Sequence, residues 1–355
     1  MFIVDAHLDL AYGALRFDRD LLRPLEETRR REARRGSHPE GIITVNIPAL
    51  LEGGVGLVFA TLFAMPESAN KTLTSNRRLV YSDAHQAHQV AGEQLDYYWR
   101  LADEVEQLRI VTDRQMLEEV LASHEDENAE NLLGFVPLME GADPVRDPRE
   151  LEEWYERGVR IIGPAWHDTR YAHGAGGSEG FTKEGFLLME VMADLGFILD
   201  ITHLSDKGSF EAFERYEGQV IASHSNARAL VPHHRHISDE LIRRLAERDG
   251  VTGVVLFNRF LKAGYTRSDP KESVTLQQVA AHIDHICQLL GDAKHVGIGS
   301  DMDGGFGLRE TPAELNSSAD LPLLGDVLAE RGYSEEDIAA IMGLNWIERL
   351  RGVLK

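Results

Sequence analysis

Cysteine is nearly absent from this 355-residue chain, which contains only Cys287. A single cysteine excludes an internal disulfide and is typical of proteins from reducing compartments. Long apolar runs are also missing, since no stretch approaches the ~20 apolar residues of a membrane-spanning helix. The first residues enter an apolar strand pattern without the basic segment of a secretory signal. We therefore expect a cytoplasmic protein without membrane insertion, with Cys287 buried in a helix.

Basic residues are scarce relative to acidic ones. The chain has 37 Lys and Arg against 59 Asp and Glu, which gives a net charge of −22 and a pI near 5.1. This balance disfavours binding to nucleic acid and to anionic membranes. Solvated helix faces account for most of the charge. Hydrophobic residues make up 43% of the chain, enough for a sizeable core without disulfides.

Apolar segments alternate with segments of helical periodicity along the whole chain. Continuous apolar runs are typical of strands that are buried on both faces of a parallel sheet. Eight strand–helix units in a chain of this length favour a (β/α)8 TIM barrel. A doubly wound open sheet is the competing arrangement. The predicted strands cover residues 2–4, 55–63, 132–139, 159–162, 197–201, 220–223, 251–257 and 295–299.

Two observations favour the barrel over the open sheet. No glycine-rich phosphate-binding loop follows the first strand. Polar residues instead occur at the C-terminal ends of the first, third, fifth, sixth and eighth strands, and these ends ring one mouth only in a barrel. We predict a single domain over residues 1–355, with a charged insertion rich in Glu and Arg around 18–41.

The polar residues at these strand ends are of types that bind metals or transfer protons. His7 and Asp9 are two residues apart on extended backbone, so their side chains point the same way. Imidazole and carboxylate groups suit zinc or a similar divalent ion. The candidate residues are His7, Asp9, Glu140, His203, His224 and Asp301.

The candidates can form a site for two metal ions. His7 with Asp9 can hold one ion, and His203 with His224 can hold the other. Glu140 can bridge them, because two neighbouring cations need an anion between them. Two ions about 4 Å apart can share a water, lower its pKa and polarise a carbonyl group.

Two further residues are expected to act on the substrate. Asp301 is predicted to be the general base beside the shared water, and then to return the proton to a leaving amine. Arg235, within a histidine-rich run at 233–236, is predicted to grip a substrate carboxylate through two hydrogen bonds. An ion pair with Asp239 is the alternative for Arg235, and a turn-forming role is the alternative for Asp301. The functional interpretation depends on five strand ends carrying such side chains together.

Motifs around these residues occur in an order that resembles a known family. They are Asp5-Ala6-His7-Leu8-Asp9, Met139-Glu140-Gly141, Thr202-His203-Leu204-Ser205, Ser223-His224-Ser225-Asn226-Ala227-Arg228, Arg235-His236-Ile237-Ser238-Asp239-Glu240, His282-Ile283-Asp284-His285-Ile286 and Val296-Gly297-Ile298-Gly299-Ser300-Asp301-Met302-Asp303-Gly304. The set spans most of the chain and is similar to the membrane (renal) dipeptidase family, the M19 metallopeptidases of the amidohydrolase superfamily.

This resemblance implies a barrel with two Zn2+ ions that hydrolyses dipeptides, including dipeptides with a D-residue at the C-terminal position. A small-molecule substrate and a homodimer are also implied. By motif position, the resemblance assigns His7 and Asp9 to one zinc ion, His203 and His224 to the other, Glu140 to the bridging carboxylate, Asp301 to the catalytic aspartate and Arg235 to the arginine that binds the substrate carboxylate.

The end of the fourth strand departs from the family pattern. Family members commonly have Thr-His there, and this chain has Ala165-Trp166, with His167 one residue later. Either His167 takes over the substrate contact or the contact is absent.

Three alternatives to a dipeptidase stay open. They are an amidohydrolase acting on N-acyl amino acids or another small ester or amide, a phosphoester or lactone hydrolase on the same barrel, and a non-catalytic metal-binding barrel.

Overall fold

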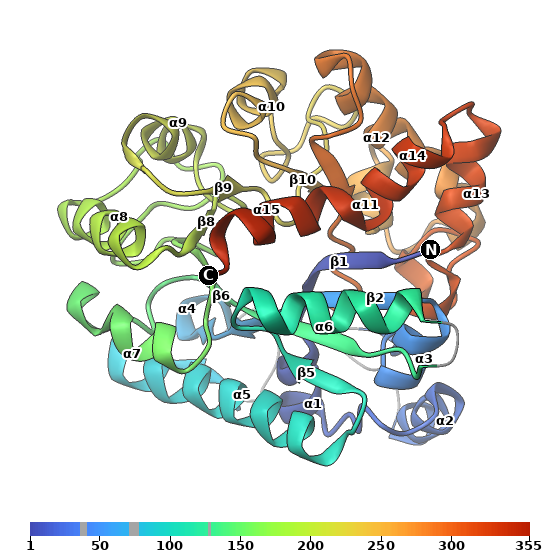
Figure 1. Ribbon diagram of the computed structural model, residues 1–355, viewed down its shortest axis with the longest axis horizontal. Helices are drawn as coiled ribbons and strands as arrows, with labels where there is room; N and C mark the ends of the chain where they lie inside the picture. Colours follow the sequence, from blue (N-terminus) through green and yellow to red (C-terminus); the bar gives the residue numbers. More distant parts are fainter. Residues whose placement is uncertain (36–40, 71–77, 127–128) are drawn as a thin grey trace.

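The computed structural model describes residues 1–35, 41–70, 78–126 and 129–355. Residues 36–40, which belong to the predicted insertion, lie outside the described residues, as do residues 71–77 and 127–128. Helices surround a central ring of strands (Figure 1). No helix in the described ranges combines the length and the apolar character needed to cross a bilayer.

In the described part of the chain, eight parallel strands form the ring: β1 (Ile3–Leu8), β2 (Val55–Phe63), β6 (Leu133–Glu140), β7 (Ile161–Gly163), β8 (Ile198–Asp200), β9 (Val220–Ile221), β10 (Thr252–Val254) and β11 (Val296–Ile298). They neighbour one another in this order, and β11 pairs with β1 through Ile298 and Asp5. A parallel bridge between Ala222 and Thr252 joins β9 to β10. The TIM-barrel prediction is therefore confirmed.

Helices follow the strands and cover the outside of the ring (Figure 1). They are α1 (Leu10–Phe17), α2 (Leu25–Arg35), α3 (Ile47–Glu52), α4 (Glu67–Asn70), α5 (Ala84–Glu104), α6 (Arg114–Glu125), α7 (Leu151–Glu156), α8 (Lys183–Leu195), α9 (Asp206–Arg215), α10 (Asp239–Ala246), α11 (Asn258–Leu261), α12 (Leu276–Leu290), α13 (Leu323–Glu330), α14 (Glu335–Ala339) and α15 (Asn345–Val353). Among the described residues, three short strands lie outside the ring: β3 (Met65–Pro66), β4 (Val80–Tyr81) and β5 (Leu108–Ile110), which pairs with β6.

Helix α15 closes one end of the ring. Its Trp346 is fully buried against Phe59 of β2, with 5.4 Å between the ring centroids. The indole N–H donates a hydrogen bond to the carbonyl oxygen of Ile298. A Cβ atom on Gly297 would lie 2.3 Å from the Trp346 Nε1 atom, so only glycine fits there. This end of the barrel is filled by apolar side chains, which leaves the other end for polar ones.

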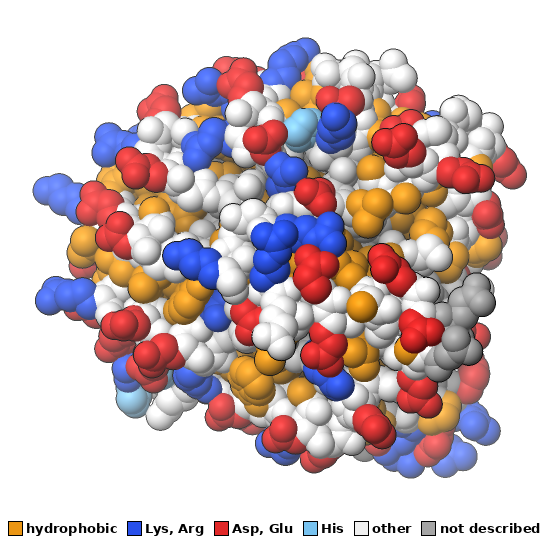
Figure 2. Space-filling view, viewed as in Figure 1, with side chains coloured by type: hydrophobic (Ala, Val, Ile, Leu, Met, Phe, Trp, Pro, Cys, Tyr) orange, Lys and Arg blue, Asp and Glu red, His pale blue; other side chains and the backbone are white. Residues whose placement is uncertain are grey.

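Charged side chains of both signs are interspersed on the face that α15 crosses (Figure 2). Arg351 of α15, for example, makes two hydrogen bonds of 2.8 and 2.9 Å to the carboxylate of Glu118 in α6. This distribution agrees with the interpretation of most of the charge as solvated helix faces.

The charged insertion is attached to the loop after β11. Within the insertion, Arg19 and Glu32 form an ion pair of 2.8 Å. Just after the insertion, Thr44 donates two hydrogen bonds to Asp303 in the loop after β11, one from its backbone N–H at 2.9 Å and one from its hydroxyl at 2.7 Å. Arg19 also approaches Asp303 to within 3.8 Å. The segment before α3 is thereby fixed beside the loop that carries Asp301.

Candidate active site

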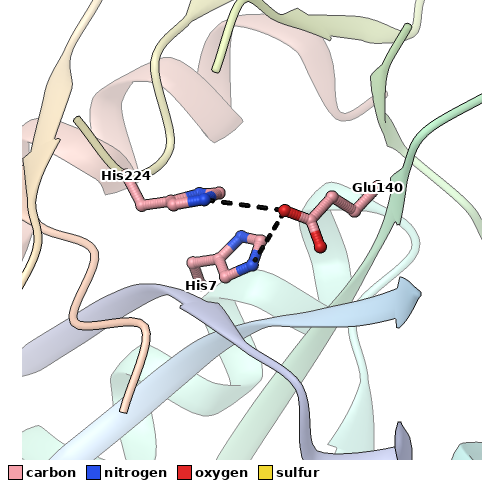
Figure 3. A group of neighbouring side chains, drawn as sticks. All are labelled: His7, Glu140 and His224. Atoms are coloured by element: carbon pink, nitrogen blue, oxygen red, sulfur yellow. Dashed lines mark ion pairs between the residues drawn. The ribbon is translucent and has the colours of Figure 1, made fainter. Parts of the chain in front are cut away.

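The candidate residues meet at the C-terminal end of the barrel. His7 is near the end of β1, and Glu140 is the last residue of β6. His203 and His224 follow β8 and β9, and Asp301 follows β11. Figure 3 shows the side chains of His7, Glu140 and His224 pointing toward one another from their separate elements. The structure thus brings together residues that are up to about 300 positions apart in the chain, as a parallel barrel permits.

Glu140 lies at the centre of the cluster. Its Oε1 atom is 2.9 Å from the Nε2 atom of His203 and 3.6 Å from the Nε2 atoms of both His7 and His224. The side chain is buried. One carboxylate oxygen therefore lies close to three imidazole nitrogens.

Asp9 and Asp301 also approach His7. Each has a carboxylate oxygen 4.0 Å from the Nε2 atom of His7, and the Thr61 hydroxyl donates a hydrogen bond to Asp9. Two groups of donor atoms, each with all members within 4.8 Å of one another, share His7: one is completed by Glu140 and His224, the other by Asp9 and Asp301.

Two of these residues have a left-handed backbone that is uncommon for side chains other than glycine. The φ angle is 70° at His203 and 57° at Asp301. Such conformations cost of order 1–3 kcal/mol and concentrate at functional sites. At Asp301 the close packing extends to Gly304, where a Cβ atom would lie 1.9 Å from the carboxylate Oδ1 atom. The backbone geometry therefore fixes the direction of the Asp301 side chain.

The pKa shifts in the cluster come mainly from burial, with a contribution from repulsion between its carboxylates. Burial raises the pKa of Glu140 well above its usual range, and repulsion from Asp9 and Asp301 raises it further. Burial also raises the pKa of Asp9 to about 6. Burial and, to a smaller extent, Arg235 lower the pKa of His7 to about 3. A divalent ion would offset the carboxylate repulsion, and neutral imidazole is the form of histidine that binds metals.

The spacing of the donor atoms fits this interpretation. Ligand atoms around a tetrahedral zinc ion are about 3.3 Å apart, and the Nε2 atoms of His203 and His224 lie 3.0 Å apart. The Nε2 atom of His203 accepts a hydrogen bond from Arg235, so this nitrogen carries no proton. It lies 2.9 Å from another acceptor, the Oε1 atom of Glu140. Acceptors that converge in a buried site are stabilised by a cation. The residues present therefore fit a divalent metal.

Arg235 lies at the edge of this cluster. Its Nη2 atom is 3.0 Å from the Nε2 atom of His203. Burial lowers the pKa of its guanidinium, while the charges of Asp301 and Glu140 oppose this effect. The alternative partner, Asp239, has its carboxylate 2.8 Å from His285. Arg235 is therefore directed to the mouth of the barrel.

A cleft of about 470 Å³ opens beside Arg235 and His203. This volume is in the range of small-molecule binding sites. Trp166 lies between Phe63 and His203, with ring centroids 4.9 and 6.1 Å away. His167 is exposed in the cleft wall, and its Nδ1 atom accepts the backbone N–H of Asp168. Trp166 and His167, where the sequence departs from the family pattern, therefore form part of the cleft wall.

Sequence reasoning missed two buried carboxylates, Asp5 and Asp200. Both precede a candidate residue on the same segment, and both hydrogen-bond a serine on the neighbouring segment. Their spacing of two or three residues before His7 and His203 was the only local signal. Their partners are visible only once the strands are assembled.

A closed parallel barrel with imidazoles and carboxylates converging at its C-terminal mouth is the architecture of metal-dependent hydrolases. The profile described as membrane dipeptidase (peptidase family M19) matches residues 1–353, and the chain belongs to this family. As a member of this family, the chain is a metallodipeptidase, and the family implies a divalent metal.

Similar sequences come from bacteria and fungi. An uncharacterized Klebsiella pneumoniae protein is 30% identical over 74% of this chain and 98% of its own length. An uncharacterized dipeptidase of Schizosaccharomyces pombe is 28% identical over 83% of this chain and 70% of its own. The dipeptidase tcpJ of Claviceps purpurea is 27% identical over 87% of this chain and 69% of its own.

Solved structures share the fold. A Rhodobacter sphaeroides metallopeptidase, liganded with a phosphinate mimic of the dipeptide L-Ala-D-Ala, superposes with a TM-score of 0.80. It is 23% identical, and 99% of each chain is covered. The probable dipeptidase PvdM of Pseudomonas aeruginosa gives a TM-score of 0.77 at 19% identity, over 99% of this chain and 95% of its own.

Proposed function

We propose that the protein is a zinc-dependent dipeptidase with two metal ions. His7 and Asp9 would hold one ion, His203 and His224 the other, and Glu140 would bridge them. The observation that carries this proposal is the position of Glu140 Oε1, within 2.9 to 3.6 Å of the Nε2 atoms of three histidines. An oxygen so placed can serve both ions at once.

The chain's own groups would bind the substrate and move the proton. When bound, the ions would supply Lewis-acid polarisation of the scissile carbonyl and lower the pKa of the attacking water. Asp301 would accept a proton from that water and deliver it to the leaving amine. Arg235 would hold the substrate carboxylate by charge-assisted hydrogen bonds, and His167 would contact the substrate from the cleft wall.

The proposed substrates are dipeptides, including those with a D-residue at the C-terminal position. The L-Ala-D-Ala mimic bound by the Rhodobacter protein of the same fold supports this range. N-acyl amino acids share the amide and the carboxylate that Asp301 and Arg235 would recognise, so they are the second candidates. A homodimer, a cytoplasmic location and a single domain over residues 1–355 stay predictions.

Hydrolysis of a dipeptide panel tests this proposal. The panel would contain L- and D-residues at the C-terminal position, with N-acyl amino acids and phosphate esters for comparison. Zinc-reconstituted protein should cleave dipeptides, and the Asp301→Asn variant should retain metal without turnover. Turnover of phosphate esters alone would overturn the proposal, and bound metal without turnover of any substrate would favour a non-catalytic barrel.

A further inference from the structure

Two buried aspartates make the same set of hydrogen bonds on different parts of the ring. Asp200 accepts the backbone N–H of Ser223 at 2.9 Å through Oδ1 and the hydroxyl of Ser223 at 2.5 Å through Oδ2. Asp5 binds Ser300 in the same way, at 2.8 and 2.5 Å. In both cases the serine directly precedes a candidate site residue, His224 or Asp301.

The two pairs differ in the second hydrogen-bond partner of the serine hydroxyl oxygen. The Oγ atom of Ser223 is 2.9 Å from the Nδ1 atom of His224. The Oγ atom of Ser300 instead accepts the backbone N–H of Met302 at 3.2 Å. Only the first pair, Asp200 with Ser223, therefore reaches the ring of a proposed metal ligand.

Proton counting determines the direction of these hydrogen bonds. A serine hydroxyl has one proton, and Ser223 donates it to the Asp200 carboxylate at 2.5 Å rather than to the Thr202 hydroxyl oxygen at 3.4 Å. The Ser223 oxygen can then only accept from His224, so the proton of the neutral imidazole lies on Nδ1. The Nε2 atom, which faces Glu140 and His203, is left with its lone pair free. The backbone of His224 is also held, since its N–H donates to the Thr202 hydroxyl at 3.2 Å.

We propose that Asp200 and Ser223 are positioning residues that fix His224 in its Nδ1–H tautomer and aim its Nε2 lone pair at the metal site. Hydrogen bonds of this kind to the distal nitrogen of a ligating histidine set its tautomer and orientation, and their loss typically weakens metal binding by roughly 10- to 100-fold. The inference rests on the proposed function only in taking His224 as a ligand.

The first test is a spectroscopic measurement on the metal-free full-length chain. In protein labelled with 15N-histidine, the ring signals of His224 are those missing from the His224→Asn variant. The wild type should show a protonated Nδ1 and an unprotonated Nε2. The Ser223→Ala variant should lose this preference, and the Ser300→Ala variant, which removes an equivalent buried hydroxyl, should keep it. A wild-type His224 protonated on Nε2, or an unchanged tautomer in Ser223→Ala, would overturn the inference.

The second test measures zinc affinity by competition with a chelator. Ser223→Ala should weaken binding by roughly 10- to 100-fold, while Ser300→Ala should weaken it far less, because Ser300 does not contact a proposed ligand ring. Ser223→Thr keeps the hydroxyl and should restore most of the affinity. Equal losses in both alanine variants would indicate general loosening of the barrel and contradict a specific role for Ser223. If the wild type binds no metal, the proposed function fails, and the tautomer measurement still decides the positioning role.

Discussion

The Nη2 atom of Arg235 lies 3.0 Å from the Nε2 atom of His203, in direct contact with the donor cluster. A carboxylate held by Arg235 would therefore lie next to the proposed metal site. This adjacency provides a structural reason for a dipeptidase to prefer dipeptides over longer peptides.

Replacing Arg235 with alanine should raise KM for dipeptides by roughly 30-fold or more, because loss of a buried charge pair costs about 2–5 kcal/mol. The effect should be much smaller for dipeptide amides, which lack the carboxylate. Arg228 provides a matched control, since its guanidinium makes two 2.6 Å hydrogen bonds to Asp206. An Arg228→Ala variant with the same rise in KM would indicate that the effect is not specific to Arg235.

The Asp301→Asn variant should fold and bind metal as the wild type does, because an amide has nearly the same shape as the carboxylate. Its kcat should fall by roughly 10²- to 10⁴-fold, the usual contribution of a positioned general base. Steady-state kinetics and metal content by mass spectrometry measure both quantities. Turnover near the wild-type rate would rule out the proposed role of Asp301.

The Glu140→Gln variant should have opposite effects on metal binding and on the metal-free fold. Loss of the central carboxylate should lower zinc occupancy. The metal-free variant should melt at the same temperature as the metal-free wild type or higher, because Glu140 is buried and repelled by Asp9 and Asp301. Glu310, which is buried and paired with Arg267, is the control. Glu310→Gln should leave zinc occupancy unchanged, and a metal-free Glu140→Gln protein less stable than its parent would contradict this account.

Acid should destabilise the protein partly through His282, which lies outside the metal cluster. Burial lowers its pKa from 6.5 to about 4, and His285 contributes a smaller effect. The unfolded chain takes up this proton below pH 6.5, whereas the folded chain does so only near pH 4. The stabilisation is therefore fully present above pH 6.5 and is lost as the pH falls toward 4, by roughly 3 kcal/mol in total.

Urea unfolding in the presence of a chelator, measured between pH 7.5 and 4.5, would test this expectation. A His282→Gln variant should show a shallower fall in the free energy of unfolding than the wild type. The imidazole Nδ1 atom accepts the backbone N–H of Ala227, and the glutamine side chain offers an oxygen for that bond. Identical pH dependence in the two proteins would show that His282 does not contribute.

Much of the barrel could be predicted because its signals are local. Strand β2 is a continuous apolar run, and helix α8 ends at Gly196, whose left-handed φ of 81° is typical of a glycine that ends a helix. Ser238, a residue type favoured at helix N-caps, caps α10 by accepting the N–H of Leu241. The candidate residues were found because each occurs where such an apolar run ends.

Elements with weak local signals were missed or assigned too simply. Strand β5 has three residues, and helix α6 was overlooked although Asp113 caps it. The sequence predicts a final helix that Ser334 caps and that runs to about Arg351. The structure bears this out, with a π-helical turn over Ala340–Leu344 that joins α14 to α15 and that the sequence did not indicate. In sequence, nothing near Asp5 identifies its partner, since Ser300 is 295 residues away.

The pairing of β1 with β11 has a consequence for synthesis of the protein. Asp5 and Ile298 are partners in the ring, so one edge of the first strand stays unpaired while a ribosome makes almost the whole chain. At roughly 5–20 residues per second, this interval lasts roughly 15–60 s. The strand that finally covers this edge leads directly into Asp301. A nascent chain therefore completes its donor cluster only in the step that closes the barrel.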